Sequence, residues 1–278
     1  MPIALALLSS LMWGASDFLG GLRSRSHPPI AVVAVSQACG LLAIGVVALV
    51  AGAGHGSSAW LPWAVAAGVS GTGGLVCFYT ALGIGTMGVV SPIAALGAVV
   101  PVLVGFAAGE RPTQLTLAGL VVALVGGVAA SGPELRGSAG VRPVLLAAVA
   151  GAGFGLAFVC IAHGSRSDVL MTLTGMRMTS VTVFVIVGLV LRSVGGLGAG
   201  DVPALALVGL GDVGANLLYG LATQRGFLSI VSVLGSLYPV VTVLLARGVL
   251  HERLMRVQLV GVAATLLGVA LVALGRAG

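Results

Sequence analysis

ERPTQLTLAGLVVALVG at residues 110–126 returns as ERLMRVQLVGVAATLLG at residues 252–268, and this recurrence organises the whole chain. Identical residues stand at one constant offset in the two copies: Glu110/Glu252, Arg111/Arg253, Leu117/Leu259, Gly119/Gly261, Leu124/Leu266 and Gly126/Gly268. Weak internal symmetry of this kind is typical of membrane proteins built from a duplicated unit. We therefore divide the chain into two halves, residues 1–132 and residues 141–278.

Both halves are apolar enough to lie in a membrane. Hydrophobic residues make up 58% of the chain and charged residues only 7%, and a membrane-spanning helix needs about 20 mostly apolar residues. We interpret the first segment as a retained helix, because no positive region precedes it and no small-residue cleavage site follows. Cutting at prolines, glycine clusters and charges predicts ten spans: 2–22, 30–51, 60–82, 88–108, 113–131, 143–163, 170–192, 203–223, 228–248 and 254–275.

The fold class that follows is an all-α integral membrane protein. Only helices and closed barrels satisfy the backbone in lipid, and the long segments with helical spacing of polar residues exclude a barrel. Five helices per half is an odd number, so the second copy crosses the membrane in the opposite sense to the first. The sequence thus predicts ten transmembrane helices as two inverted five-helix repeats, with a binding site where the repeats meet.

Three prolines fall inside predicted helices rather than at their ends. Pro92 and Pro101 lie in the fourth segment and Pro239 lies in the ninth. Proline kinks a helix and frees backbone carbonyls, which membrane proteins tolerate mainly beside a cavity or another helix. We expect these prolines to mark the gating elements.

Two carboxylates lie where lipid would otherwise surround them. Asp17 stands in WGASDF (13–18) and Asp212 stands in the eighth segment, and a charge at the centre of a membrane helix costs about 2.5–3.5 kcal/mol. Desolvation can bring a carboxyl group into the range where it exchanges protons. We expect both to be proton-coupling groups in a polar cavity, and the deeper Asp212 is the stronger candidate.

Other polar and aromatic side chains are expected to line the same cavity. Asp212, Asn216 and Tyr219 share one helix face, and serines recur in the ninth segment. Arg177 leaves three alternatives open: it reaches the membrane surface, it neutralises Asp17 or Asp212, or it binds a substrate carboxylate. The full set of predicted cavity residues is Trp13, Gln37, Tyr79, Arg177, Asn216, Tyr219, Ser236 and Tyr238.

Several functions are disfavoured by what the sequence lacks. The net charge of +6 comes from arginines scattered at segment ends, without the basic stripe of a nucleic-acid-binding protein. The cysteines and histidines are dispersed, so we predict no disulfide, no metal site and no cofactor. No phosphate-binding GxxxxGK[ST] loop occurs. GLGD (209–212) matches an intramembrane aspartyl protease motif, but its companion motifs are out of order, and we predict that the protein is not an enzyme.

Two glutamates open the repeated segments. Glu110 and Glu252 each stand just ahead of a predicted helix, and a carboxylate is favourable near the positive end of the helix dipole. We interpret both as capping residues rather than catalytic ones.

These motifs resemble a known family of carriers. WGASDF (13–18) and the segments that close the two halves, SPIAALGAVVPVLVGFAAGERPTQLTLAGL (91–120) and SLYPVVTVLLARGVLHERLMRVQLVG (236–261), are similar to the EamA repeats of the drug/metabolite transporter superfamily. The resemblance implies a secondary carrier in the cell (inner or plasma) membrane that exports small metabolites, amino acids or drugs. One departure stands out, because the family usually carries an arginine early in its second helix, where this chain has Gln37 in SQACG.

Some alternatives stay open at this point. A lipid-headgroup flippase or a non-transporting membrane scaffold would have a similar sequence. The arginines of the loops favour termini outside the cell, whereas the resemblance implies cytoplasmic termini. The expected partners are a small-molecule substrate and the lipid bilayer, and the chain is expected to be a monomer or a homodimer.

Overall fold

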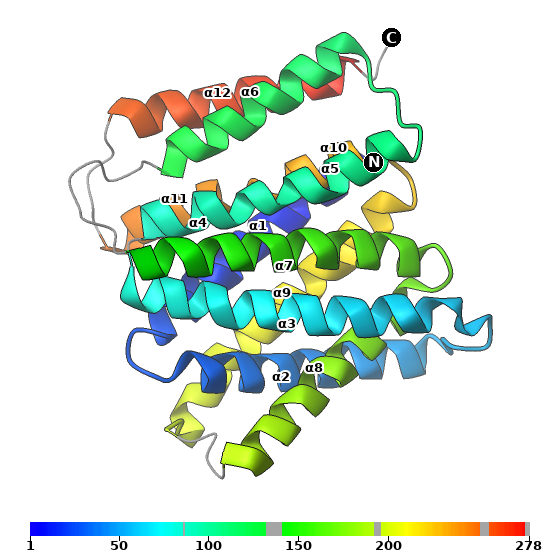
Figure 1. The fold of residues 1–278 in the computed structure, drawn as a ribbon, viewed down its shortest axis with the longest axis vertical. Coiled ribbons are helices and arrows are strands. Elements are labelled where there is room, and N and C mark those ends of the chain that lie inside the picture. The colour runs from blue at the N-terminus through cyan, green and yellow to red at the C-terminus, as the bar shows by residue number, and fades with distance from the viewer. Residues whose placement is uncertain (86, 132–140, 192–195, 251–255, 276–278) are drawn as a thin grey trace.

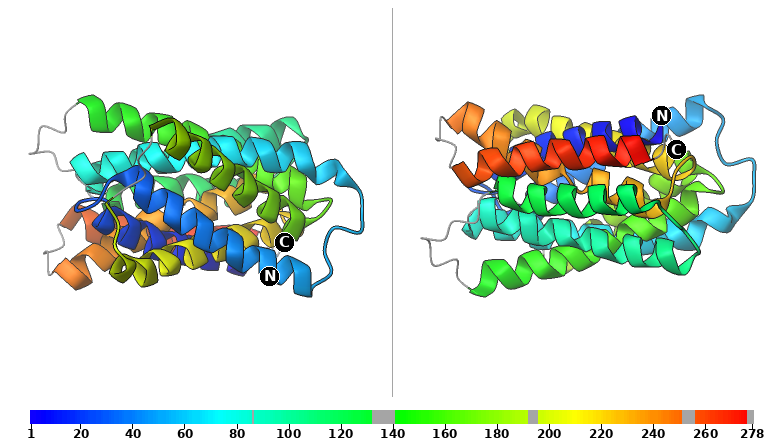
Figure 2. Two further views of the ribbon diagram at one scale, coloured as in Figure 1. Left: turned by 90° about the horizontal axis from the view of Figure 1, so that it is seen from below. Right: turned by 90° about the horizontal axis from the view of Figure 1, so that it is seen from above.

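The computed structural model describes residues 1–85, 87–131, 141–191, 196–250 and 256–275. These residues form α-helices joined by short loops and 3-10 turns, with no β-strand among them. Figure 1 and Figure 2 show a bundle whose helices run roughly across the molecule, with several of them stacked one behind another.

The helices match the ten predicted spans. The first half contains α1 (Pro2–Arg23), α2 (Pro29–Val50), the 3-10 turn η1 (Ser58–Trp60), α3 (Leu61–Ile84), α4 (Met87–Ala95), the 3-10 turn η2 (Leu96–Ala98), α5 (Val99–Ala107) and α6 (Gln114–Ser131). The second half contains α7 (Val141–Ser165), α8 (Val169–Leu191), the 3-10 turn η3 (Ala199–Asp201), α9 (Val202–Thr223), α10 (Leu228–Gly235), α11 (Tyr238–Leu250) and α12 (Arg256–Gly275). The consecutive pairs α4–α5 and α10–α11 each make one interrupted span, so the prediction of ten helical spans is confirmed.

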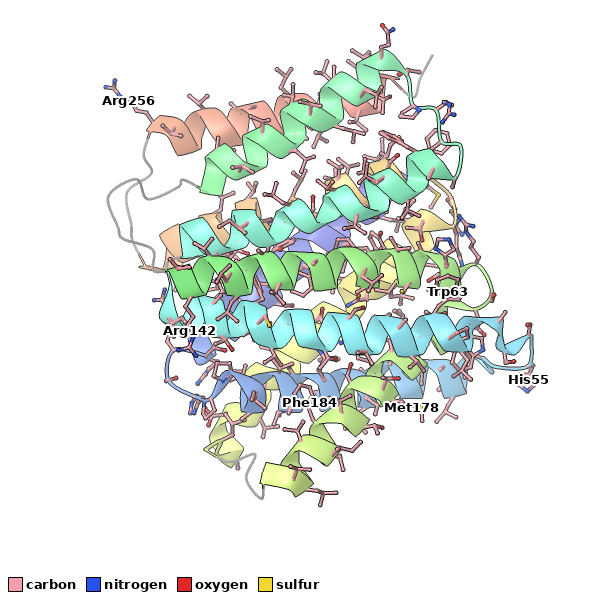
Figure 3. The ribbon with its side chains drawn as sticks, viewed as in Figure 1. His55, Trp63, Arg142, Met178, Phe184 and Arg256 are labelled. Atoms are coloured by element: carbon pink, nitrogen blue, oxygen red, sulfur yellow. The ribbon has the colours of Figure 1, made fainter. Side chains whose placement is uncertain are left out.

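Length and surface both fit a membrane protein. Within the described ranges, six helices are long and apolar enough to cross a membrane, and four shorter apolar helical stretches accompany them. Charged side chains such as Arg142 and Arg256 lie at one end of the helices and His55 lies at the other, whereas Met178 lies between the ends (Figure 3). Met178 is 57% exposed, as expected for a side chain that faces lipid.

The two interrupted spans break at equivalent places. LGAVVP (96–101) and LGSLYP (234–239) occupy the same position in the two halves. The first becomes a 3-10 turn before α5, and in the second the residues between α10 and α11 leave the helix. Pro101 and Pro239 therefore lie in the first turn of α5 and α11, where the missing N–H breaks no helical hydrogen bond. By contrast, α4 continues through Pro92.

The halves exchange their first helices. The helix α1 packs on α9, α10 and α11 of the second half, and its counterpart α7 packs on α3, α4 and α5 of the first half. In Figure 1 the colour along the two helices shows that α1 and α7 run in opposite directions, and Figure 2 shows the start of α1 and the end of α12 at the same end of the molecule. This is the inverted arrangement that the odd helix count predicts.

Two mixed bundles result from this exchange. Bundle one contains α3, α4, α5, α7 and α8, because α8 packs mainly on α3 and α2. Bundle two contains α1, α2, α9, α10 and α11, because α2 packs mainly on α9 and α8. Each bundle therefore takes helices from both halves of the sequence, and the bundles meet mainly where α2 packs on α8 and where α5 packs on α10.

The repeated glycines of the opening motif bring α6 and α12 together. A Cβ atom on Gly268 would lie 2.4 Å from the Ala123 backbone nitrogen, and a Cβ on Gly126 would lie 2.5 Å from the Thr265 nitrogen. The two helices therefore touch backbone to backbone, which small residues make possible in membranes. The pair forms a separate layer at one edge of the molecule (Figure 1).

Glu110 caps a helix, although not the one that follows it. Its carboxylate accepts hydrogen bonds from the backbone N–H groups of Leu228 and Ser229 and from the Ser229 hydroxyl group. The negative charge thus lies at the positive end of α10, in the other half of the chain. The equivalent Glu252 lies outside the described residues.

Replacing Gly268 with leucine should separate α6 from α12. The side chain would overlap the Ala123 backbone, and overpacking of this kind costs about 1–3 kcal/mol or more. We expect Gly268→Leu to lower the thermal unfolding temperature in detergent, whereas Gly45→Leu, where no atom lies within 4 Å, should not. Equal unfolding temperatures for the two variants would contradict the close contact.

Removing the Glu110 charge should weaken the start of α10. Glu110→Gln keeps the size of the side chain but loses the charge and one acceptor, and losing a helix cap costs about 1 kcal/mol. We expect a lower unfolding temperature for Glu110→Gln than for Arg111→Gln, because Arg111 is exposed and donates only to nearby carbonyls. A larger effect at Arg111 would show that the cap is unimportant.

Candidate functional site

A cavity lies between the two bundles, in the middle of the helices. The space open to the centres of water molecules is about 60 Å³, enough for several waters. Seven helices contribute to it: α1, α2, α3, α7, α8, α9 and α11. The lining combines aromatic, polar and charged side chains: Trp13, Asp17, Gln37, Ala67, Gly71, Thr72, Leu75, Phe154, Ala157, Phe158, Ile161, Met176, Arg177, Ser180, Asp212, Asn216 and Tyr238.

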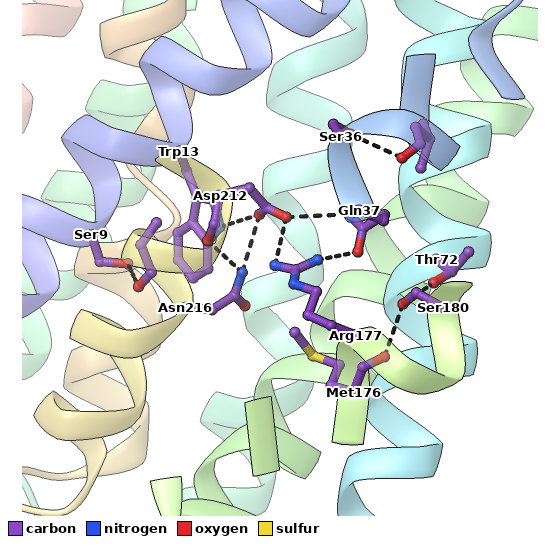
Figure 4. Close-up of polar contacts among 12 residues, drawn as sticks. Ser9, Trp13, Ser36, Gln37, Thr72, Met176, Arg177, Ser180, Asp212 and Asn216 are labelled. Atoms are coloured by element: carbon purple, nitrogen blue, oxygen red, sulfur yellow. Dashed lines mark hydrogen bonds and ion pairs between the residues drawn. The ribbon is translucent and has the colours of Figure 1, made fainter. Parts of the chain in front are cut away.

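An ion pair holds one wall of the cavity (Figure 4). The Arg177 Nη2 atom lies 2.7 Å from Asp212 Oδ2, and the Arg177 side chain is only 4% exposed. The helix α9 presents Asp212 and Asn216 on one face, and Asn216 Nδ2 donates to Asp212 Oδ1 at 3.1 Å. Of the alternatives for Arg177, the structure therefore favours neutralisation of Asp212.

Two further side chains donate hydrogen bonds to the Asp212 carboxylate. The Trp13 Nε1–H donates to Oδ1 at 3.0 Å, and Gln37 Nε2 donates to Oδ2 at 3.3 Å. The Gln37 carbonyl oxygen accepts from Arg177 Nη1. The amide of Gln37 thus bridges the two ions, and the carboxylate has donors on both oxygens, as a buried charge requires.

Gln37 and Arg177 occupy equivalent positions in the two halves. Both lie early in the second helix of their repeat, on α2 and α8, and these helices pack on each other. The inverted repeat therefore brings the two side chains together near its pseudo-two-fold axis. With a glutamine at one of these positions and an arginine at the other, this point holds one cation, and one carboxylate neutralises it.

Asp17 differs from Asp212 because it lacks a cation. Its side chain lines the cavity and is 7% exposed, and no ion pair within the described residues includes it. Its side chain interacts with Tyr79, whose ring packs against Gly20 on the same turn of α1 as Asp17. A buried carboxyl group without a cation is costly in a membrane and is a candidate functional group.

Two stacked aromatic rings, Trp13 and Phe158, form another wall, and Tyr219 stacks on Phe158 from behind. The Trp13 and Phe158 ring centroids are 5.0 Å apart, and those of Phe158 and Tyr219 are 4.8 Å apart. Tyr238 follows the break between α10 and α11, and its buried hydroxyl group has no hydrogen-bond partner in the described part of the chain. Tyr238 is also one of the residues that line the cavity, so this hydroxyl group is a polar atom close to the cavity without a partner among the described residues.

The other predicted cavity residues lie behind the wall. Tyr79 and Tyr219 are fully buried outside the lining. The Tyr219 hydroxyl group pairs with Ser232 at 2.7 Å, and the Ser236 hydroxyl group donates to the Val233 carbonyl at 2.8 Å. These groups connect helices or cap a helix end, and we no longer expect them to contact a bound molecule directly.

The sequence reasoning missed the wall contributed by bundle one. Phe154 and Phe158 line the cavity, together with Thr72, whose hydroxyl group donates to Ser180 at 2.6 Å. One signal existed, because FGLAFV (154–159) faintly repeats WGASDF (13–18). The repeat places Phe154 and Phe158 at the positions of Trp13 and Asp17, and it could have identified both phenylalanines.

Breaking the ion pair from one side should destabilise the protein more than removing it entirely. A single loss leaves a buried unpaired charge, which costs about 3–5 kcal/mol, whereas an apolar pair of similar volume is often tolerated. We expect Arg177→Met and Asp212→Leu each to lower folding yield and unfolding temperature, and the double variant to recover part of the loss. A double variant no better than the worse single one would contradict a direct pairing.

Comparison with known proteins gives the family. A solved crystal structure superposes with a TM-score of 0.79 over 99% of this chain and 98% of that chain, at 21% identity, which shows a shared fold. No curated protein matches the chain significantly. The family model of the EamA-like transporter family matches residues 1–131 and again residues 141–274. The chain therefore belongs to the EamA-like transporter family and is a multi-pass membrane protein of the drug/metabolite transporter superfamily.

Proposed function

We propose that the protein is a secondary transporter of the cell membrane that exports small organic molecules by alternating access, with proton coupling through Asp17. The observation that carries the proposal is the central cavity, which lies between two bundles of inverted topology and contains a buried carboxyl group without a cation. Substrate and ion sites of many secondary transporters lie at such a repeat interface.

The interrupted helices support a motion around this cavity. Tyr238 lines the cavity at the first residue of α11, immediately after the break that follows α10. Residues at the ends of helical elements absorb the backbone changes of hinge motions. We therefore place the gating movement at the breaks before Pro101 and Pro239, and we assign Pro92 no separate hinge because α4 runs through it.

The ion pair changes which carboxylate is the better coupling group. The Asp212 carboxylate has a charged partner and accepts hydrogen bonds from three further side chains. A proton that binds this carboxylate would have to compete with all four groups. Asp17 faces the cavity with Tyr79 as its polar neighbour. We therefore assign proton exchange to Asp17 and a structural role to Asp212, which reverses the order inferred from depth in the sequence.

Energy for export would then come from the proton gradient. No nucleotide-binding loop occurs in the sequence, and a carboxyl group that faces each side in turn can load and release a proton. In this mechanism Asp17 binds the proton while the cavity is open to one side and releases it when the cavity opens to the other.

The Asp17→Asn variant should fold but lose its response to a proton gradient. In proteoliposomes containing the wild type, we expect a pH gradient to accelerate the movement of at least one compound in a defined mixture of amino acids, aromatic amines and aromatic acids, quantified by mass spectrometry. The variant should lose at least about tenfold of this acceleration, the equivalent of about 1.4 kcal/mol. Asp17→Glu, which keeps a carboxyl group, should retain part of it.

Two outcomes would contradict the proposed function. If Asp17→Asn, monodisperse in detergent, transports as fast as the wild type under the gradient, Asp17 is not the coupling group. If the wild type moves none of the compounds with or without a gradient, the assignment as a transporter of such molecules fails.

A further inference from the structure

The charge of the cavity sets the class of molecule that fits it. The lining contains three charged side chains, Asp17, Arg177 and Asp212. Arg177 and Asp212 neutralise each other at 2.7 Å, so the ionised cavity carries one net negative charge, located on Asp17. A cation bound in the cavity would restore neutrality, whereas an anion would add a second uncompensated charge in a medium that disfavours it.

Arg177 already binds two protein acceptors and its charge is neutralised by Asp212. Its Nη1 atom donates to Gln37 and its Nη2 atom donates to Asp212. Its Nε atom has no partner among the described residues, but it is fully buried and lies near the Gly40 position of α2, 3.6 Å from where a Cβ would stand. Asp212 thus takes the place that a substrate carboxylate would need beside the guanidinium group, and a second carboxylate there would compete with it.

The rest of the wall suits an organic cation with an apolar body. Trp13, Phe154 and Phe158 supply aromatic surface, and Leu75 and Ile161 supply aliphatic surface. Aromatic faces attract cations by about 0.5–2 kcal/mol. The Tyr238 hydroxyl group, buried and without a partner in the described residues, offers an acceptor for an ammonium N–H.

We propose that the cavity binds monovalent organic ammonium compounds, with the cationic head at Asp17 and Tyr238 and the apolar body against the aromatic wall. This substrate class rests on the transport function proposed above, because it concerns the same cavity. This class is narrower than the range of substrates that the family resemblance implies, since it excludes molecules recognised through a free carboxylate.

A matched series of small ligands tests the charge preference directly. Thermal unfolding in detergent at neutral pH is measured with 2-phenylethylammonium, the neutral 2-phenylethanol, the anionic 3-phenylpropanoate and zwitterionic phenylalanine, which share an aromatic ring and a two-carbon chain. Hexylammonium and benzyltrimethylammonium extend the series to an aliphatic body and to a head without N–H groups. We expect saturable stabilisation by the ammonium compounds and little by the neutral, anionic and zwitterionic ones.

Variants locate the binding site. Asp17→Asn should weaken binding of 2-phenylethylammonium at least about tenfold, and Tyr238→Phe should weaken it a few-fold. Asp201→Asn is the control, because Asp201 is a partly buried carboxylate that pairs with Arg23 and His27 outside the cavity, and the affinity of this variant for the ammonium should equal that of the wild type. If Asp17→Asn does not fold, the ligand series on the wild-type protein decides the question alone.

Each contrary result overturns the inference. It fails if 3-phenylpropanoate or phenylalanine stabilises the wild type more than 2-phenylethylammonium does, if the neutral alcohol is equally effective, or if no ammonium compound stabilises it. It also fails if folded Asp17→Asn binds the ammonium as tightly as the wild type. Binding without movement across proteoliposomes would instead refute transport and leave the cation site intact.

Discussion

The structure depends on keeping one arginine charge satisfied inside a membrane. Arg177 reaches the protein interior from α8 and pairs with Asp212, which receives further hydrogen bonds from Trp13, Gln37 and Asn216. Four helices meet through these contacts, α1 and α2 from the first half and α8 and α9 from the second. Since an unpaired charge would cost several kcal/mol there, the network fixes how the halves face each other and leaves the cavity beside it.

The inverted repeat explains why a glutamine completes this network. Equivalent residues of α2 and α8 meet near the pseudo-two-fold axis, so two arginines at these positions would face one another and require a second carboxylate. The Gln37 amide accepts from Arg177 and donates to Asp212, which a second arginine cannot do because it has no acceptor. Gln37 thus makes a single ion pair sufficient, and among the described residues Asp17 is left as the charge in the cavity wall without a cation.

The sequence predicts the architecture better than the site. Ten spans, their duplication and the interrupted fourth and ninth helices follow from apolar length, from the spacing of the repeated glycines and from the prolines, because these are local constraints. The partner of Arg177 could not be predicted from the sequence. The three alternatives for this side chain (reaching the membrane surface, pairing with an aspartate or binding a substrate) differ only in tertiary contacts. Tyr219 and Ser236 each lie on the same polar side of a helix as residues that line the cavity. That side is wide enough to face more than one direction, and these two side chains bond to neighbouring protein groups instead of facing the cavity.

Glu110 and the phenylalanines show two other limits of sequence reasoning. A glutamate before a helix suggests capping of that helix, yet α5, which ends just before Glu110, packs on α10 of the other half, and the carboxylate caps α10 instead. Phe154 and Phe158 carry no chemical signature in an apolar chain, and only their equivalence to Trp13 and Asp17 singles them out. Knowledge of the symmetry therefore adds more to site prediction here than residue type does.

The position of the ion pair also constrains how the bundles can move. Asp212, Gln37, Asn216 and Trp13 all belong to bundle two, whereas Arg177 is the one member of the network from bundle one. Separating the bundles at this point would expose an unpaired charge and cost about 3–5 kcal/mol, while rotation about the pair keeps it intact. In the alternating access proposed above, a motion that pivots near Arg177 would therefore cost least, and the breaks before Pro101 and Pro239 would take up the larger displacement.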